Sequence, residues 1–305
     1  EILHNVTLSV RKGEVLGIAG VEGNGQSELI KVLTGVMTVT KGKITLNGKD
    51  VTNAWPDKLR KFGIGIIPED RYAQGLCRDM SIPENCIAGY FDTHGVCSKG
   101  VLKNKKMKQL CDEFIQKYDI RVSDKYGLIS QLSGGNAQKV IIAREFENNP
   151  DLIIADEPTT ALDVTIEAQI LQLMKKLCRE QGTSIILITH NMGVVAEICD
   201  YVYVMYAGKV MEQAETFELF EHTEHPYTAG LLKSIPRLDE KVERLYTIEG
   251  VVPNLLHLPA GCNFCTRCKE ASERCFMEKP CLYQTRDGHG VRCFKYESEV
   301  QLDGR

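Results

Sequence analysis

The chain has 305 residues, of which 43% are hydrophobic and 26% are charged, and its formal net charge is −4. This composition is typical of a globular protein with one large or two modest domains, and the slight negative charge argues against a nucleic-acid partner. No apolar run approaches the ~18 residues of a membrane span and no charged-then-apolar leader is present, so we expect neither a transmembrane helix nor a signal peptide. The start at Glu1, without Met and inside a predicted strand, is compatible with a fragment.

Short strands and helices alternate in the first part of the chain. We predict strands at Ile2–Val10, Val15–Ala19, Ile44–Leu46 and Gly65–Ile67, and a helix at Ser27–Leu33. The segment at about 80–135 differs, because it is polar, basic at Lys103–Lys108, and has apolar residues at helical spacing from Leu110 to Tyr118. This segment predicts an inserted helical subdomain.

The alternation returns after the insertion and stops near residue 222. We predict helices at Asn136–Asn148, Ile166–Leu177 and Val194–Ile198, and strands at Leu152–Ala155, Ser184–Ile188 and Tyr201–Met205. Such alternation implies an α/β domain with a mainly parallel sheet covered on both faces. We therefore expect an α/β domain over residues 1–221 and a small, irregular, Cys-rich region over residues 222–305, where prolines interrupt the pattern.

A glycine-rich loop lies between the second predicted strand and the first helix. It reads Gly-Val-Glu-Gly-Asn-Gly-Gln-Ser from Gly20 to Ser27. In this context backbone N–H groups converge on phosphate oxygens and the terminal Ser is placed to bind Mg²⁺. The candidate nucleotide-binding residues are Gly20, Gly23, Asn24, Gly25, Gln26 and Ser27. The Lys expected before Ser27 is replaced by Gln26, and losing that charged donor costs on the order of 3–4 kcal/mol in a transition state, roughly 10²–10³ in rate.

A second group of motifs runs from Leu132 to Asp163. Leu-Ser-Gly-Gly at 132–135 opens a predicted helix, and the following apolar strand ends in Asp156-Glu157-Pro158. A glycine turn at a helix start can bind phosphate, while paired acids after a strand can hold Mg²⁺ and position a water. Each element alone could be a turn, a buried strand or a solvated acidic pair. Together, in this order, they predict nucleotide hydrolysis.

These motifs resemble the ATP-binding subunits of ABC transporters. The resemblance implies an ABC-type P-loop NTPase fold, with ATP and Mg²⁺ as cofactors and an ATPase activity impaired by Gln26. It implies Asp156 and Ser27 at Mg²⁺, Glu157 as general base and His190 as the histidine that contacts the γ-phosphate. It further implies that Ser133, Gly134 and Gly135 complete the site of a partner ATPase, and that Glu69 replaces the family's usual Gln at Mg²⁺ and the membrane subunits. A solvated acid at Glu69 and a structural role for His190 are the alternatives.

Two branches of that family are represented. Residues 1–155, through Gly20–Ser27, Pro68–Arg71 and Ser133–Lys139, resemble the second ATPase half of ribose- or nucleoside-type importers, where the phosphate loop is commonly degenerate. Residues 156–305, through the motif at 156–165 and His-Pro-Tyr-Thr at 225–228, resemble oligopeptide/dipeptide importer ATPases. We therefore predict a mosaic joined near Ile154–Asp156.

Six of the 12 cysteines lie between Cys262 and Cys293. Four of them, Cys262, Cys268, Cys275 and Cys293, match a set that in the peptide-importer family is suited to an iron–sulfur cluster. Four thiolates can hold [4Fe–4S] or a tetrahedral Zn²⁺, and Cys265 and Cys281 could compete as ligands. Free thiols or disulfides are the remaining alternatives, although disulfides are disfavoured in a reducing cytosol.

The resemblance implies an ATP-hydrolysing importer subunit, peripheral on the cytoplasmic side of the cell membrane. Its partners would be transmembrane permease subunits and a second ATPase subunit, and Gln26 favours a heterodimer with a competent partner. The Cys-rich tail favours peptide uptake over sugar or nucleoside uptake. The alternatives are a nucleotide-binding regulatory subunit with little turnover and a soluble ABC-type ATPase of DNA repair or translation.

Overall fold

The computed structural model describes residues 2–235 and 246–302. The chain divides into two compact units: unit 1 comprises residues 1–10, 14–31 and 187–305, and unit 2 comprises residues 11–13 and 32–186. The predicted boundary at residues 221/222 lies inside unit 1, where the chain returns to its N-terminal segment. The segment around the glycine-rich loop, residues 14–31, therefore belongs to the same unit as the C-terminal region.

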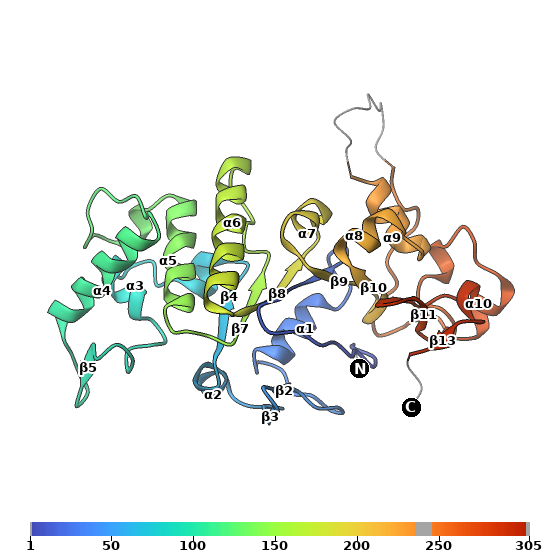
Figure 1. Cartoon of the computed structure of the whole chain (residues 1–305), viewed down its shortest axis with the longest axis horizontal. Helices are drawn as coiled ribbons and strands as arrows, with labels where there is room; N and C mark the ends of the chain where they lie inside the picture. The colour runs from blue at the N-terminus through green and yellow to red at the C-terminus, as the bar shows by residue number, and fades with distance from the viewer. Residues whose placement is uncertain (1, 236–245, 303–305) are drawn as a thin grey trace. The chain divides into compact units, whose positions relative to one another are not determined.

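Unit 1 is built on a sheet whose strands run in the order β13-β11-β12-β10-β9-β1 (Figure 1). β1 (Val15–Ala19) pairs in parallel with β9 (Tyr201–Tyr206), and β10 (Lys209–Glu215) turns back antiparallel to β9. The C-terminal hairpin of β11 (Tyr283–Arg286) and β12 (His289–Val291) extends the sheet from β10, and β13 (Val300–Gln301) pairs with β11. The C-terminal region is thus continuous with the sheet that carries β1.

The helices of unit 1 are short. They are α1 (Gln26–Leu33), which runs past residue 31 into unit 2, α7 (Met192–Ile198), α8 (Thr216–Glu221), α9 (Pro226–Lys233) and α10 (Glu273–Met277). Single 3₁₀ turns form at Cys265–Arg267 and Phe294–Tyr296. α9 begins with Pro226 after the cap residue His225, whose ring Nδ1 accepts the backbone N–H of Tyr227 at 3.0 Å. Both devices favour a helix start at this point, because proline lacks the N–H that a first turn leaves unpaired.

Unit 2 has a core of buried parallel strands. β4 (Ile64–Ile67) pairs with β7 (Leu152–Asp156), and β8 (Ser184–Thr189) follows β7 in the strand order and ends in unit 1. The helices are α2 (Pro56–Lys61), α5 (Gly134–Phe146) and α6 (Val164–Gln181), and a π-helical turn, η1, spans Arg71–Gly75. A small hairpin of β2 (Thr45–Leu46) and β3 (Lys49–Asp50) completes the unit.

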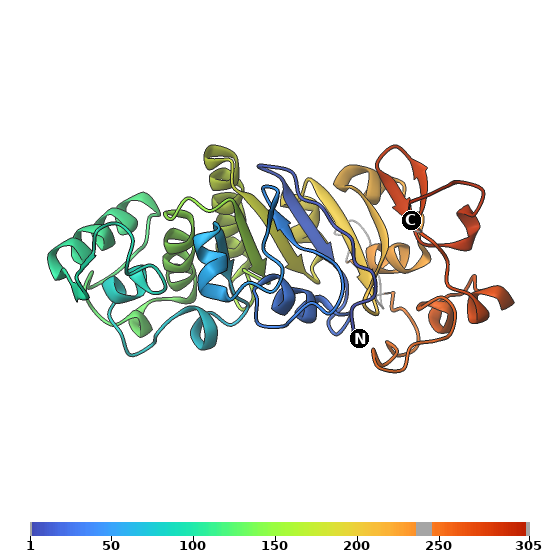
Figure 2. The ribbon, with the colours of Figure 1, turned by 90° about the horizontal axis from the view of Figure 1, so that it is seen from below.

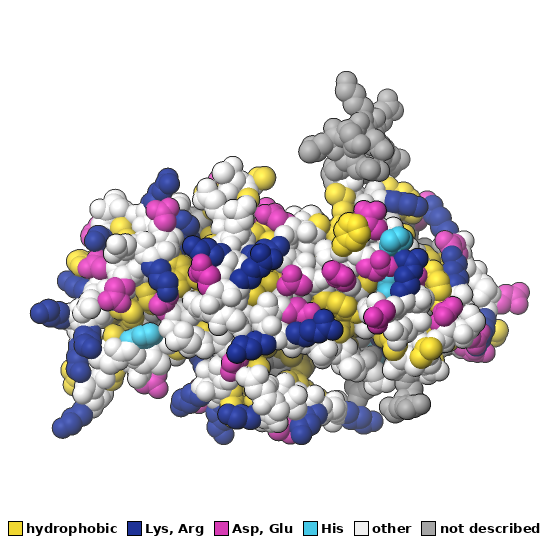
Figure 3. All heavy atoms as spheres, in the orientation of Figure 1, with side chains coloured by type: hydrophobic (Ala, Val, Ile, Leu, Met, Phe, Trp, Pro, Cys, Tyr) yellow, Lys and Arg dark blue, Asp and Glu magenta, His cyan; other side chains and the backbone are white. Residues whose placement is uncertain are grey.

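The predicted helical insertion is present in unit 2. It contains α3 (Ile82–Ile87), α4 (Asn104–Lys117), a hairpin of β5 (Cys97–Ser98) and β6 (Val101–Leu102), and a 3₁₀ turn, η2 (Ile129–Gln131). Ser81 and Glu84 form a reciprocal cap on α3, and α4 lies against α3 (Figure 2). The helix α4 buries Met107, Leu110, Cys111 and Phe114, while its lysines are exposed and contribute to the basic side chains over this end of unit 2 (Figure 3).

Several predicted elements differ from the structure. The helices expected from Ile166 and Val194 begin two residues earlier, at Val164 and Met192. The strand expected at Ile2–Val10 is wrong: the segment is irregular, and Asn5 has a φ of +50°, which interrupts an extended backbone. The helix expected from Asn136 begins earlier, at Gly134, so both signature glycines lie in its first turn. Residues after 222 contain regular elements that the prolines and cysteines concealed, namely α9, α10 and β11–β13.

Candidate functional site

The glycine-rich loop of unit 1 runs from the end of β1 to the start of α1, as predicted. Gly20, with a φ of +153°, approaches β9 so closely that a Cβ there would lie 2.5 Å from the carbonyl oxygen of Met205. Gly25, with a φ of +96°, would place a Cβ 3.1 Å from the Cα of Gly208. Only glycine fits these positions, and with glycine there the loop packs against the β9–β10 turn. Its backbone N–H groups precede the N-terminus of α1, where a phosphate can bind.

Gln26 occupies the position where a lysine was expected, and its side chain is turned inward. Only 7% of Gln26 is exposed, and its Nε2 donates a 3.2 Å hydrogen bond to the carbonyl oxygen of Gly20. The amide therefore closes the loop on itself and brings no positive charge. Ser27, the predicted Mg²⁺ ligand, is exposed at the first turn of α1.

Asn24 is completely buried, and its side chain holds the loop in place through three hydrogen bonds. Its Nδ2 donates to the carbonyl oxygen of Val21 at 2.9 Å and to the hydroxyl of Tyr227 at 3.2 Å, and its Oδ1 accepts the N–H of Ala207 at 2.9 Å. The side chain predicted to bind nucleotide is thus bound within the protein. Tyr227 is a contributor that sequence reasoning missed, although the His-Pro-Tyr motif marks its position.

Unit 2 carries an acidic cluster, which we define as Glu69, Asp156 and Glu157. Asp156 ends β7, Glu157 follows it with a φ of +39°, and Glu69 comes shortly after the neighbouring strand β4. Because β4 and β7 are parallel, their carboxyl ends meet at one edge of the sheet. Burial, together with the charges of Glu69 and Glu157, raises the pKa of Asp156 from 3.8 to about 7.

The acidic cluster fits a divalent cation held jointly with a phosphate. Within residues 2–235 and 246–302 no three His, Cys, Asp or Glu side chains are arranged to enclose a metal ion. Mg²⁺ does not require such a cage, because it is usually held by one or two carboxylates, waters and substrate phosphates. A cation would also offset the charge repulsion that raises the pKa of Asp156. His190, the other predicted residue, is exposed just after β8 and belongs to unit 1.

The predicted signature forms the N-terminus of α5 in unit 2. Ser133 is the cap residue, and its Oγ accepts a 2.9 Å hydrogen bond from Nδ2 of Asn136. A Cβ on Gly135 would lie 2.5 Å from Cγ2 of Ile166, and one on Gly134 would lie 2.8 Å from Nη1 of Arg71. Close packing against Ile166 therefore explains Gly135, while Gly134 places the helix N-terminus beside the guanidinium of Arg71.

Arg71 was not among the predicted site residues. Only 7% of it is exposed, and its guanidinium donates to the carbonyl oxygen of Thr160 while it lies beside Gly134. It stands two residues after Glu69 in the first turn of η1. Arg71 thus links the segment after Glu69 with the signature and with the loop that follows Glu157.

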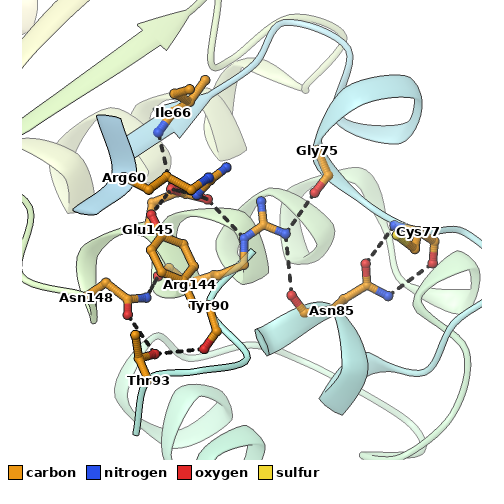
Figure 4. A network of polar contacts seen from close by, with 10 residues as sticks. All are labelled: Arg60, Ile66, Gly75, Cys77, Asn85, Tyr90, Thr93, Arg144, Glu145 and Asn148. Carbon is orange, nitrogen blue, oxygen red and sulfur yellow. Dashed lines mark hydrogen bonds and ion pairs between the residues drawn. The ribbon is translucent and has the colours of Figure 1, made fainter. Parts of the chain in front are cut away.

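A buried carboxylate near the end of α5 ties that helix to β4 (Figure 4). The Glu145 side chain is fully buried and accepts hydrogen bonds from Arg60 at 3.0 Å, from Arg144 at 3.0 Å and from the hydroxyl of Tyr90 at 2.7 Å. It also accepts the backbone N–H of Ile66 at 3.2 Å. With these donors the buried charge is compensated, and the signature helix is fixed to the strand that leads to Glu69.

Five of the six clustered cysteines line one cavity of about 220 Å³ in the C-terminal region, namely Cys262, Cys265, Cys268, Cys275 and Cys293. Its wall also includes His225, Phe264 and Lys295, whereas Cys281 is not part of the lining. Burial raises the pKa of Cys262 to about 12, and it raises the pKa values of Cys265, Cys268 and Cys293 in the same direction. Within residues 2–235 and 246–302 the cysteines form no disulfide bond.

Within the two described ranges, no helix has the length and apolar character needed to cross a membrane.

Comparison with known proteins identifies two family models along the chain. A model described as "ABC transporter" matches residues 3–160, and one described as "Oligopeptide/dipeptide transporter, C-terminal region" matches residues 211–275. The oligopeptide transport ATP-binding protein AppD of Bacillus subtilis is 39% identical, over 96% of this chain and 90% of that protein. The oligopeptide transport ATP-binding protein OppD of Escherichia coli is 37% identical, over 98% of this chain and 88% of that protein.

Solved structures of ATP-binding cassettes have the same fold. The structure of cbiO1 from Clostridium perfringens, part of the ABC transporter complex cbiONQ, covers 73% of this chain and 85% of that chain, with a TM-score of 0.61 and 26% identity. A nucleotide-free ATP-binding cassette from an ABC transporter covers 75% of this chain and 92% of that chain, with a TM-score of 0.63 and 24% identity.

Proposed function

Because the chain belongs to the ABC transporter ATP-binding proteins of the oligopeptide/dipeptide type, we propose that it binds ATP with Mg²⁺ and drives peptide uptake as a peripheral subunit on the cytoplasmic side of a membrane. The peptide assignment is supported by the match over residues 211–275 and by relatives whose names specify oligopeptide transport. Sugar or nucleoside uptake is the alternative that the first 155 residues favour.

The acidic cluster is the observation that carries the ATPase proposal. A carboxyl with a pKa near 7 between two further carboxylates is an unfavourable arrangement unless a cation shares the site. Mg²⁺ that arrives with a nucleotide would offset the repulsion between these carboxylates, since a bound cation is often the largest charge in such a site. In this proposal Asp156 and Ser27 are Mg²⁺ ligands, and Mg²⁺ when bound neutralises phosphate charge.

Each remaining site residue has a role set by its position. The N–H groups of Gly23, Gly25 and the α1 N-terminus bind phosphate oxygens. Glu157 accepts the proton of the attacking water, and His190 orients that water against the γ-phosphate. The inward-turned Gln26 provides no charge to the phosphates, so we propose that this site turns over slowly.

The signature then acts on a partner. We propose that Ser133, Gly134 and Gly135 complete the ATP site of a second ATPase subunit, and that a competent partner is preferred over a second copy of this chain. Transmembrane permease subunits would complete the assembly. If the partnered complex binds ATP without turnover, the chain is instead a regulatory subunit.

The test is ATP hydrolysis by the purified chain, with Glu157→Gln as the variant. We expect slow hydrolysis by the unaltered chain and none above background in the variant, because the water loses its base. Binding of Mg·ATP should persist in both proteins. A robust rate that Glu157→Gln leaves unchanged would contradict the proposed mechanism.

The cysteine-lined cavity supports a cofactor proposal. We propose that Cys262, Cys268, Cys275 and Cys293 hold an iron–sulfur cluster, with Zn²⁺ as the alternative. Four tetrahedral ligands of Zn²⁺ converge at about 2.3 Å from one point, and the described residues contain no group so arranged. Iron–sulfur clusters are held by Cys thiolates, and the four proposed ligands line the same cavity of about 220 Å³.

The proposed mosaic origin rests on the motifs alone, because those of residues 1–155 and those of residues 156–305 resemble different importer branches. We propose that residues 1–155 descend from a ribose/nucleoside-type importer ATPase. Separate trees for residues 1–155 and 156–305 test this, and the same placement of both segments would overturn it.

A further inference from the structure

The phosphate loop is held by a hydroxyl that is distant in sequence but belongs to the same unit. The hydroxyl oxygen of Tyr227 accepts the backbone N–H of Val21 at 3.0 Å and Nδ2 of Asn24 at 3.2 Å. These bonds span 206 and 203 residues of sequence. They join the first turn of α9 to two residues of the loop between β1 and α1.

The tyrosine is itself fixed by its surroundings. Tyr227 has no exposed surface, and its ring centroid lies 4.7 Å from that of Tyr206 and 5.4 Å from that of Phe264. Its backbone N–H is bound by the cap residue His225 at 3.0 Å. Burial lowers the pKa of His225 to about 4, so the ring is neutral near pH 7 and its Nδ1 is available as an acceptor. The hydroxyl therefore has little freedom to follow a moving loop.

A second tie from the C-terminal region reaches the same loop through the β9–β10 turn. Nδ2 of Asn263 donates to the carbonyl oxygen of Ala207 at 2.9 Å, and the N–H of Ala207 donates to Oδ1 of Asn24 at 2.9 Å. The N–H of Gly208 donates to the carbonyl oxygen of Asn24 at 2.9 Å. Asn24 is thus the point at which both ties meet.

We propose that the Tyr227 hydroxyl is a positioning residue for the phosphate loop, through which α9 sets the affinity of the chain for nucleotide. The inference rests on the proposed ATP binding. Gln26 closes the loop with one neutral hydrogen bond, so the loop's shape depends on supports outside it. Removing the hydroxyl leaves the part-buried N–H of Val21 without its acceptor and takes one of the two acceptors of Asn24 Nδ2. The loop then spends less time in the shape that receives phosphate. Apparent affinity falls with the population of that shape.

Two matched variants of the full chain test the proposal. Tyr227→Phe removes the hydroxyl and keeps the ring, whereas Tyr206→Phe does the same for its buried neighbour, whose hydroxyl faces Arg267 at 3.4 Å. We expect Tyr227→Phe to weaken Mg·ATP binding by about tenfold in calorimetry, which corresponds to ~1.4 kcal/mol. Tyr206→Phe should remain within about twofold of the unaltered chain. Equal affinities for the two variants would overturn the proposal.

A double-mutant cycle separates positioning from general destabilisation. If Tyr227 acts through Asn24, then Tyr227→Phe should weaken binding much less in an Asn24→Ala background than in the unaltered chain. Full additivity of the two effects contradicts that route. Thermal unfolding of both Phe variants shows whether they lose the same stability. If weaker Mg·ATP binding only followed lower stability, an equally destabilised Tyr206→Phe would bind Mg·ATP as weakly as Tyr227→Phe.

Amide hydrogen exchange gives a result that does not depend on nucleotide. In Tyr227→Phe, exchange should accelerate across residues 21–27, beyond the one amide that loses its acceptor, while Tyr206→Phe should leave this segment protected. Unchanged exchange at residues 23–27 would contradict the proposal. If the unaltered chain binds no Mg·ATP, the proposed function fails, and the exchange measurement still decides whether Tyr227 holds the loop.

Discussion

Replacing Asp156 with Asn removes one charge from the acidic cluster and keeps the shape of the side chain. In the folded chain the pKa of Asp156 is raised from 3.8 to about 7 by burial and by Glu69 and Glu157. The folded state therefore binds a proton over a pH range in which the unfolded state has released it, so stability falls as the pH rises from about 4 to about 7. The variant lacks this loss, because its amide stays neutral.

The magnitude follows from the size of the shift. A shift of about 3 units at 1.36 kcal/mol per unit gives an upper bound of ~4 kcal/mol, and the partial exposure of Asp156 reduces this to about 2 kcal/mol. For a chain of this size that is about 4 °C in Tm. We expect Asp156→Asn to be more stable than the unaltered apoprotein at pH 8 by this amount, and equal to it near pH 4.

The assay is thermal unfolding in EDTA at pH 4, 6 and 8, with Asp92→Asn as the control. Asp92 is an exposed carboxylate of unit 2 outside the acidic cluster, so its variant should show no such pH-dependent gain. With Mg·ATP present the order should reverse, because only the unaltered chain gains stability from the ligand. A gain that is the same at pH 4 and pH 8, or a loss at pH 8, would refute the reasoning.

Three further outcomes are expected from the same structure. Gln26→Lys should raise ATP hydrolysis by roughly a hundredfold, and adding Glu157→Gln should abolish that gain; an unchanged rate would show that the missing charge is not limiting. Glu145→Ala should lower the free energy of unfolding in urea by ~3–5 kcal/mol because it leaves the buried Arg144 and the half-buried Arg60 without their carboxylate partner, whereas Tyr90→Phe should cost ~1 kcal/mol; a small effect of Glu145→Ala would show that water replaces the carboxylate. Anaerobically purified protein should contain iron in elemental analysis, and Cys262→Ser should reduce it; the absence of both iron and zinc would exclude a metal at this cavity.

The motifs were predictable because each is local. The loop at Gly20–Ser27, the acids after β7 and the signature glycines lie between elements whose periodicity is visible in the sequence. The positions of β1, β4, β7 and β9 agree with the predicted strands to within one residue at each end. Buried apolar runs bounded by turn residues explain this agreement.

The supports of those motifs could not be predicted in this way. Arg71 and Tyr227 act through contacts with residues far along the chain, and no local pattern shows which neighbour a polar side chain will meet. Glu145 in a helix reads as a solvent-facing acid until its four donors are seen together. At Ile2–Val10 the alternation was misleading, because Asn5 turns the backbone out of the extended region.

The long span between Tyr227 and Val21 also has a consequence during synthesis. The N–H of Val21 leaves the ribosome 206 residues before the hydroxyl that binds it. At bacterial and eukaryotic rates of about 5–20 residues per second, this delay is roughly 10–40 s. The signature and the acidic cluster are synthesised during that interval, and throughout it the glycine loop lacks the Tyr227 bonds. The glycine loop would thus gain these bonds only after both the signature and the acidic cluster have been made.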